Sequence, residues 1–465
     1  MLVSDDFEEE SHRPRLNSAL SDLGQFNNIL RELKYPPPSI SADYGDFGGG
    51  QLTEAYEYIA EQLEVRWKNG PTLKLDYIKE LANKVLNQLK LVSITLGTEN
   101  NPNEIFENLN FSGQKLQNSD RVRNLAFSQF NDPEAMAQIY NSGWQPFEKK
   151  FDAEERSDTF PGYIFPFSLV HNPGTNQARC VEDLREHWES QVTSTDPPTK
   201  FASTVIKDLS KCAPTYLALR TGKEGNFPVE LGQQLLVLNR LRMPQSMYSY
   251  VMKLVLESQS EKSIPSASVV SCLKLLETYV VRRMFHGIES GGLLAVARGL
   301  WASTGGDPEK MLDALDSNPT QEFPEDEVFE KDIRSAHLYE KRGEFPGFVL
   351  DEYERGLESS EGYVDRAFTV DHIMPQTLGT GWAIDSDVHE KWLHTWANLT
   401  PLTKAPNSTK SNQSWEAAVD LLKTEQSFKT TLKIAHENAH WDESSLERRA
   451  NELVDWGLKR WPKSV

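Results

Sequence analysis

The sequence has few cysteines, no long apolar run and a deficit of positive charge. Its three cysteines, Cys180, Cys212 and Cys272, lie far apart without CxxC spacing, which supports neither a disulfide framework nor a thiolate zinc site. No segment offers the roughly 18 consecutive apolar residues of a transmembrane helix, and the acidic segment Met1–Glu10 lacks the basic and apolar regions of a secretory signal. We therefore expect a cytoplasmic protein with reduced thiols and no membrane partner.

The formal net charge is −20, from 49 Lys and Arg against 69 Asp and Glu. A protein that coats DNA through bulk electrostatics needs a positive surface and counterion release, so this charge argues against that class. Basic and acidic residues roughly balance in Pro401–Val465, and the negative excess lies upstream. Any contact with nucleic acid is therefore expected to be local.

Length and composition indicate several packing units. A chain of 465 residues is too long for one ordinary core, and 38% hydrophobic with 25% charged residues is typical of a globular protein. The turn-rich, polar segments Val170–Pro198 and Ser303–Pro324 are the best linker candidates. We divide the chain into an α-rich part at 1–170, a helical bundle at 171–320 and a C-terminal domain at 321–465.

Apolar residues at helical spacing predict most of the secondary structure. Helices are expected at Leu52–Leu63, Phe201–Arg220, Glu230–Leu256 and Ser266–Phe285. The β-branched segment Leu91–Leu96 predicts a short strand. The expected fold class is therefore mainly α and multi-domain.

The C-terminal domain has a different pattern. Ala367–Ile373 predicts a strand that Pro375 closes, Asn398–Leu402 a second short strand, and Ser411–Thr424 a helix after polar start signals. The order is strand, long excursion, strand, helix. This is the order that a small ββα-metal motif requires.

Polar residues in this region have the chemistry of a hydrolytic site. Phosphodiester hydrolysis needs a deprotonated water and positive charge near the phosphate, which a base and one divalent cation supply. His372 is the candidate base, and Asp371 is a candidate metal ligand if the strand ends there. From the second strand, Asn398 is expected to hydrogen-bond the imidazole. Asn407, at the start of the helix, would complete an oxygen-rich shell suited to magnesium.

Three short motifs carry a family resemblance. They are Thr-Val-Asp-His-Ile-Met-Pro-Gln-Thr at 369–377, Trp-Ala-Asn-Leu-Thr-Pro-Leu at 396–402 and Asn-Ser-Thr-Lys-Ser-Asn at 407–412. Together they resemble the C-terminal HNH nuclease domain of GmrSD-type restriction endonucleases. The resemblance implies that Asp371 and Asn407 are metal ligands, that His372 is the general base and that Asn398 orients it. Ala397 stands where the family commonly has Gly.

Further resemblance lies outside the hairpin. Upstream and downstream residues resemble the helical surround of the same domain, so that about the last quarter of the chain is covered: Tyr339, 350–354, Trp441, Arg449 and Trp456. Residues in the first third resemble the helical part that follows a ParB-like NTP-binding core in the same proteins: 105–110, Gly113, Leu116, Asp120, Arg123, Asn124 and Trp144. The core itself, with its Asp-Gly-Gln-Gln-Arg motif, is missing, so we expect either a truncated start or a separate polypeptide that supplies it.

What the resemblance implies is a DNA endonuclease of a modification-dependent restriction system, active in antiphage defence. It would use Mg²⁺ or Mn²⁺, and an NTP only where the missing or separate N-terminal half is supplied. Its partners would be DNA, including modified phage DNA, and either a ParB-like NTPase or a second copy of the chain. Lys404 and Lys410 are candidate phosphate contacts.

Less specific interpretations stay open. His372 alone would fit a structural histidine paired with Asp371, asparagines at these positions also suit turns and helix caps, and lysines suit a solvated face. His389, His394, His436 and His440 match no closed zinc site and are interpreted as surface or packing residues. Two other functions are a catalytically silent DNA- or partner-binding subunit of a restriction complex, and an assembly subunit whose helical bundle docks an ATPase or GTPase.

Overall fold

The computed structural model shows two compact units, Met1–Leu109 and Asn110–Val465. The boundaries expected after residues 170 and 320 both fall inside the second unit. None of the described helices combines the length and apolar composition that crossing a bilayer requires. The structure describes residues 23–33, 50–69, 74–90, 116–130, 132–151, 159–259, 264–341, 343–357, 367–379, 381–382, 384–403, 414–424 and 428–465.

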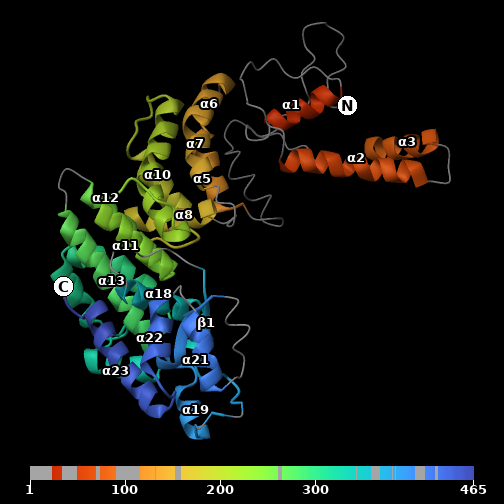
Figure 1. Cartoon of the computed structure of the whole chain (residues 1–465). Coiled ribbons are helices and arrows are strands. Elements are labelled where there is room, and N and C mark those ends of the chain that lie inside the picture. Colours follow the sequence, from red (N-terminus) through yellow and green to blue (C-terminus); the bar gives the residue numbers. More distant parts are fainter. Residues whose placement is uncertain are drawn as a thin grey trace. The chain divides into compact units, whose positions relative to one another are not determined.

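The first unit contains α1 (Leu23–Glu32), α2 (Gln51–Asn69) and α3 (Lys74–Asn83), which continues into a π-helical turn (Figure 1). Gln25 of α1 caps α2, because its Oε1 accepts hydrogen bonds from the backbone N–H groups of Leu52 and Thr53, each at 3.1 Å. These groups have no partner within the helix. The helix expected at Leu52–Leu63 is confirmed, and the strand expected at Leu91–Leu96 lies outside the described residues.

The second unit begins with helices around an aromatic core. Trp144, Phe147 and Phe160 lie edge-to-face at 5.5 to 6.0 Å between ring centroids, and Tyr163 donates a 2.6 Å hydrogen bond to the carbonyl of Leu209. The helices are α5 (Asn118–Phe127), α6 (Pro133–Ile139), α7 (Gln145–Glu148), α8 (Thr159–His171), α9 (Cys180–Glu189), α10 (Pro198–Thr221), α11 (Val229–Arg240) and α12 (Tyr248–Ser258).

Two expectations for this part are wrong. The linker candidate Val170–Pro198 contains α9, whose Trp188 is fully buried and which packs against α8, α5 and α10. The helix expected at Glu230–Leu256 is broken into α11 and α12. Arg242 adopts a positive φ of 55° there, and Pro244 lacks the N–H that a continuing helix needs.

Helix α13 (Ser266–His286) is the central element, since it packs against α11, α12, α15 (Pro308–Asp316) and α16 (Asp326–Ser335). It ends at Gly287, whose φ of 90° is readily adopted only by glycine. Arg282 is fully buried; it donates hydrogen bonds to the carbonyls of Trp461 and Pro324 at 2.8 to 3.1 Å. This helix therefore joins the bundle to the last part of the chain. Helix α14 (Leu293–Thr304) packs on α15.

The C-terminal part holds the two described strands, β1 (Thr369–His372) and β2 (Leu399–Leu402). They pair antiparallel, with His372 opposite Leu399 and Thr369 opposite Leu402. Helix α21 (Trp415–Thr424) follows, so the expected order of strand, strand and helix is confirmed. The helices that pack on the hairpin are α18 (Phe345–Leu357) and α22 (Lys429–Glu437). The other helices are α17 (Leu338–Lys341), α19 (Ser386–Trp392) and α23 (Glu443–Arg460).

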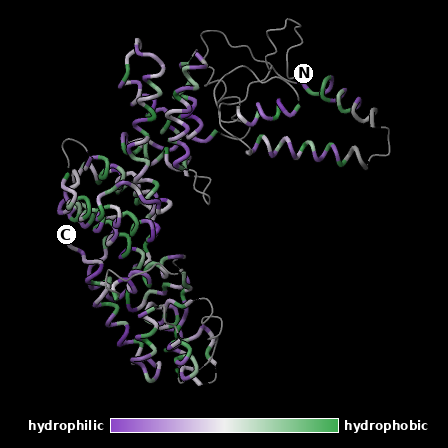
Figure 2. The backbone as a smooth tube through the Cα atoms, turned by 45° about the horizontal axis from the view of Figure 1, so that its top comes forward, coloured by the Kyte–Doolittle hydropathy of each residue, from purple (hydrophilic) through white to green (hydrophobic). Residues whose placement is uncertain are grey.

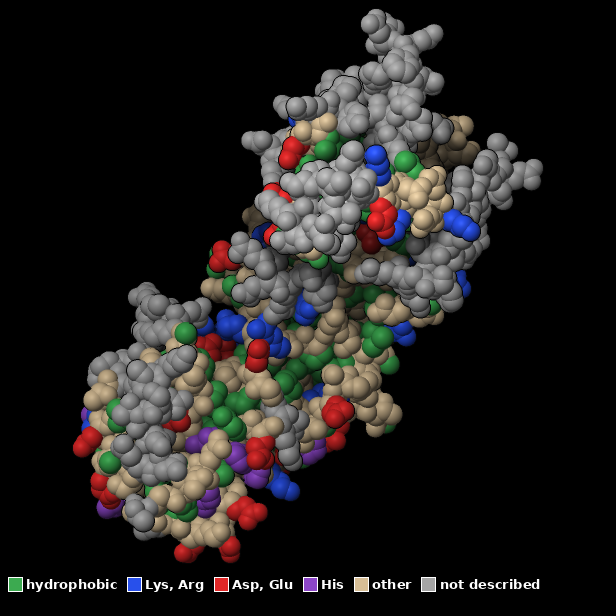
Figure 3. All heavy atoms as spheres, turned by 90° about the vertical axis from the view of Figure 1, so that its right-hand side faces the viewer, with side chains coloured by type: hydrophobic (Ala, Val, Ile, Leu, Met, Phe, Trp, Pro, Cys, Tyr) green, Lys and Arg blue, Asp and Glu red, His purple; other side chains and the backbone are tan. Residues whose placement is uncertain are grey.

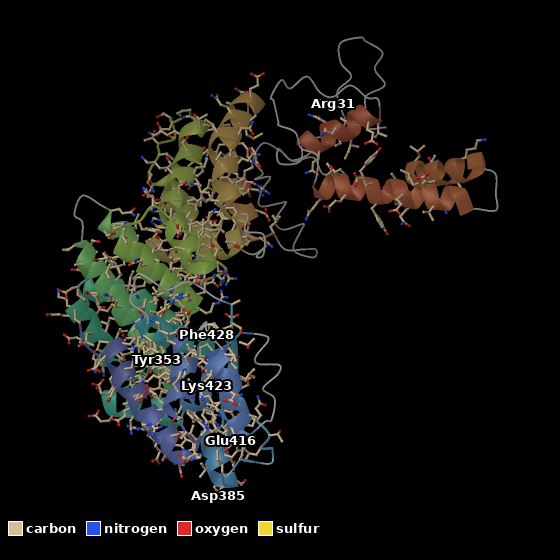
Figure 4. The ribbon with its side chains drawn as sticks, in the orientation of Figure 1. Arg31, Tyr353, Asp385, Glu416, Lys423 and Phe428 are labelled. Carbon is tan, nitrogen blue, oxygen red and sulfur yellow. The ribbon has the colours of Figure 1, made fainter. Side chains whose placement is uncertain are left out.

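Buried polar contacts hold this hairpin in place. Glu354 of α18 accepts hydrogen bonds from the backbone N–H of Thr430 at 2.9 Å and of Lys429 at 2.5 Å, capping α22. Arg449 donates a 2.8 Å bond to the carbonyl of Leu399 at the start of β2. Phe428, just before α22, packs edge-on against Phe368, just before β1 (Figure 4). In Figure 2 hydrophilic and hydrophobic residues alternate along the helices, as expected where one face is buried.

Candidate active site

The site forms where β1 ends. Along the strand, Val370 and Asp371 are half-buried and His372 is buried. Pairing continues for one more bond, in which the N–H of Ile373 donates to the carbonyl of Asn398 at 2.8 Å. Pro375 then follows and offers no N–H for the ladder. The strand therefore ends directly after the Asp371-His372 pair.

Asn398 fixes the turn that follows His372. Its Oδ1 accepts a 2.8 Å bond from the N–H of Met374, and its Nδ2 donates to the carbonyls of Met374 and Leu393 at 3.0 and 2.9 Å. The expected bond from Asn398 to the imidazole is not among these contacts. Because the side chain is fully buried, its amide satisfies backbone groups, and it positions His372 through the main chain.

The imidazole of His372 is contacted by Gln376 of its own motif and by residues from two other segments. Its Nε2 lies 3.2 Å from Nδ1 of His394, and its Nδ1 lies 3.4 Å from the side-chain nitrogen of Gln376. The ring of Tyr339 packs edge-on against it at 4.2 Å between centroids. Only 5% of His372 is exposed, so these contacts largely determine its orientation.

Glu340 sets the state of His394. One of its carboxylate oxygens lies 3.0 Å from Nε2 of His394, which favours a proton on that nitrogen. Burial lowers the pKa of His394, and His337 and His389 act in the same direction, whereas Glu340 raises it. The ring is therefore neutral at pH 7, its Nδ1 carries the lone pair, and Nε2 of His372 must be the donor between the two rings. In this tautomer Nδ1 of His372 is left unprotonated.

Asp371 supplies a hard oxygen donor beside His372. It pairs with Thr400 across the hairpin and is half-buried. One carboxylate and several waters form a typical magnesium shell, so Asp371 fits such a cation. Asn407, Lys404 and Lys410 lie outside the described residues, and their predicted roles stay predictions.

Sequence reasoning missed the residues that contact or orient the base. His394 had been interpreted as a packing histidine, and Glu340 and Gln376 were given no role. Gln376 lies inside the first motif and Glu340 directly follows Tyr339, so the family resemblance contained a signal for both. Figure 3 shows histidine and acidic side chains close together on the lower part of the visible face, over the C-terminal elements.

The residues that resembled the helical surround have structural contacts. Glu352 forms ion pairs with Arg240 and Arg460 at 2.5 and 2.7 Å, and Tyr353 packs edge-on against Trp456 at 5.2 Å between ring centroids. In the first third, Arg123 pairs with Asp120 at 3.0 Å and with Glu148 at 3.6 Å. Apart from the Arg123–Asp120 pair within α5, these contacts join helices, which agrees with a structural role for both groups.

Comparison with known proteins supports the C-terminal assignment. No curated protein matches the chain. Residues 323–456 match the C-terminal domain of GmrSD restriction endonucleases. This region begins next to Pro324, whose carbonyl accepts a hydrogen bond from Arg282, and it ends within α23. It includes the whole hairpin. The C-terminal part of this chain is therefore similar to the C-terminal domain of GmrSD restriction endonucleases.

Proposed function

We propose that the chain is a metal-dependent endonuclease of the ββα-metal (HNH) type that hydrolyses DNA phosphodiesters, with His372 as general base. The observation that carries the proposal is the row formed by Glu340, His394 and His372 at the end of β1. It leaves an unprotonated imidazole nitrogen next to a carboxylate that suits a divalent cation. A histidine with only a packing role has no need of a fixed tautomer.

In the proposed reaction, Nδ1 of His372 takes a proton from a water molecule as the water oxygen attacks the phosphorus. The imidazolium that forms donates to His394, and Glu340 stabilises the positive charge through that ring. Asp371, together with Asn407, would hold Mg²⁺ or Mn²⁺. When bound, the cation offsets the charge that develops on the leaving oxygen. The products are a 5′-phosphate and a 3′-hydroxyl.

The biological context of the proposal is restriction of phage DNA in the cytoplasm, including modified DNA. One such site cuts one strand, so a double-strand break needs a second copy of the chain or two successive nicks. A net charge of −20 makes binding depend on the cation and on local contacts, with Lys404 and Lys410 as the candidates. Nucleotide dependence enters only with a ParB-like half.

The test is nicking of supercoiled plasmid, unmodified or phage-modified, with Mg²⁺ or Mn²⁺. We expect His372→Ala to lose activity by on the order of a hundredfold or more. His436→Ala, which changes an exposed histidine of α22, serves as the matched control and keeps full activity. Equal nicking by the wild type and His372→Ala would refute the assignment.

The alternative is a DNA- or partner-binding subunit that does not cut, which the net charge of −20 favours. It predicts no nicking by the wild type, even when a ParB-like NTPase partner is supplied. That outcome would replace the proposed nuclease with an adaptor.

A further inference from the structure

A second cluster of metal-ligand side chains lies in the helical part, on elements outside the matched domain. His171 ends α8, His187 lies on α9 and Asp208 lies on α10. One donor atom of each comes within 4.8 Å of the other two. Among the described residues, it is the one group of three or more His, Cys, Asp or Glu side chains whose donor atoms come this close together. The proposed reaction uses none of these residues.

The distances match those of a tetrahedral transition-metal site. Nε2 of His171 and Nε2 of His187 lie 3.3 and 3.4 Å from the same Oδ2 atom of Asp208. Zinc binds nitrogen and carboxylate oxygen at about 2.0 to 2.1 Å, so two ligands of a tetrahedron lie about 3.3 to 3.4 Å apart. The two distances from the histidine nitrogens to Oδ2 of Asp208 therefore already equal those between ligands of one shared ion.

The contacts at His171 do not satisfy it by other means. Its Nε2 is buried and has no hydrogen-bond partner, although Oδ2 of Asp208 is 3.3 Å away. Burial lowers the pKa of His171 to about 4, against the opposing effect of Asp208. The ring is therefore neutral at pH 7, which is the state in which imidazole binds metals.

Neighbouring donors orient the carboxylate. Trp188 donates a 2.9 Å hydrogen bond to Oδ2 of Asp208, and Lys211 donates a 3.1 Å bond to Oδ1. Burial alone would raise the pKa of Asp208, but His171, Trp188 and Lys211 lower it overall, so the carboxylate is ionised. Outer contacts of this kind typically fix the ligands of a metal site.

The open side of the cluster faces solvent at His187, whose side chain is 32% exposed. The side-chain nitrogen of Gln191 lies 2.9 Å from Nε2 of His187. Gln191 is exposed and has to turn aside when that nitrogen binds an ion. A water molecule can then complete the four-coordinate shell.

We propose that His171, His187 and Asp208 form a zinc-class transition-metal site that joins α8, α9 and α10. Two imidazoles and one carboxylate suit Zn²⁺ better than Mg²⁺, which prefers oxygen ligands. The site is separate from the proposed nuclease site in residues, in elements and in the class of metal. Its bound ion cross-links three helices of the second unit.

The test is titration of the chelator-treated full chain with Zn²⁺ by calorimetry, and with Co²⁺ by visible absorption, which reports tetrahedral coordination. We expect one Zn²⁺ at this cluster, a higher Tm on binding, and a loss of affinity on the order of a hundredfold or more in His187→Ala, which lacks one of three protein ligands. His286→Ala is the matched control, because His286 is 34% exposed and also contacts an aspartate.

His372→Ala is measured in parallel, because the nuclease site also contains imidazoles. Retention of the zinc by His372→Ala and its loss in His187→Ala, with unchanged circular dichroism, support the cluster. Equal zinc affinity of His187→Ala and the wild type, or absence of zinc binding by the wild type at micromolar concentrations, would overturn the proposal. Neither result depends on nuclease activity.

Discussion

At the scale of single residues, a carboxylate that does not contact His372 favours one of its two imidazole tautomers. Glu340 contacts Nε2 of His394 and favours a proton on that nitrogen. Nδ1 of His394 then accepts a hydrogen bond from Nε2 of His372. The arrangement follows the logic by which a buried carboxylate orients a catalytic histidine. Glu340 and His394 are therefore positioning residues in the proposed reaction.

We expect Glu340→Gln to lower the nicking rate by roughly ten- to a hundredfold, because an amide can donate as well as accept and no longer fixes the proton on His394. Stability should hardly change, since Glu340 is 52% exposed. Glu344→Gln is the control, because Glu344 lies in the same segment and is 71% exposed. A rate equal to that of the control would show that the tautomer is set by other contacts.

The residue scale is also where the sequence was least informative. Asp371, His372 and Asn398 were found because they belong to short motifs, and the structure brings all three to one turn. The partners of Asn398 were not predictable, because a buried amide bonds to whichever backbone groups the fold places beside it. Glu340 and His394 were missed because they are 54 residues apart in the chain and no pattern of spacing joins them.

At the scale of elements, helix α22 supports the hairpin and is itself capped from another helix. Glu354 of α18 occupies the position usually taken by a capping side chain of the helix's own first turn, and its charge faces the positive end of the helix. Thr431 of α22 donates a 2.7 Å bond to the carbonyl of Pro401 in β2. The cap on α22 therefore also secures β2.

Glu354→Ala should destabilise the domain by about 2 kcal/mol, because it leaves two buried N–H groups of α22 without a partner. Hydrogen exchange is expected to quicken in 429–437 and in 399–402 together. Exchange that quickens in the helix alone would show that β2 is held independently of α22. Urea unfolding of Glu354→Ala and the wild type measures the loss in unfolding free energy.

Elements were the most predictable level of the fold. Apolar spacing located α2, α10 and α13, and the strand-like segments Ala367–Ile373 and Asn398–Leu402 located both strands. The failures have local causes: the αL conformation of Arg242 ends a helix that periodicity alone would extend, and the polar surface of α9 resembled a linker although Trp188 anchors it in the core.

At the scale of the whole second unit, an ionic network ties the bundle to the C-terminal part of the chain. Arg460 of α23 contacts Glu277 of α13 and Glu352 of α18, each at 2.7 Å, and Arg240 of α11 contacts Glu352 at 2.5 Å. Glu277 is fully buried and also accepts from Trp461 at 2.8 Å. Four elements therefore meet around two carboxylates.

This network predicts acid sensitivity. Burial alone would raise the pKa of Glu352, but Arg460 and Arg240 more than offset it and lower the pKa below its ordinary 4.5. A lowered carboxylate pKa contributes stability above 4.5, and that contribution is lost as the pH falls through the folded-state value. We expect Glu352→Gln to cost about 3 kcal/mol at neutral pH, because it removes the buried carboxylate charge that two arginines share.

The corresponding measurement is urea unfolding of Glu352→Gln, the wild type and the exposed control Glu447→Gln at about pH 7 and about pH 3.5. The difference between Glu352→Gln and the wild type should shrink at the lower pH, because the wild-type carboxyl also becomes neutral. A difference in unfolding free energy that is the same at both pH values would mean that the glutamine disturbs the packing and not the charge.

The bond between Arg282 and the carbonyl of Trp461 also orders events during synthesis. His372 leaves the ribosome well before Trp461, and until that residue emerges Arg282 lacks one of its acceptors and Glu277 lacks one donor. The nascent chain therefore contains the complete first motif before the helices that support it are fully packed. The packing of α23 and Trp461 is therefore the step that completes the scaffold of the proposed nuclease site.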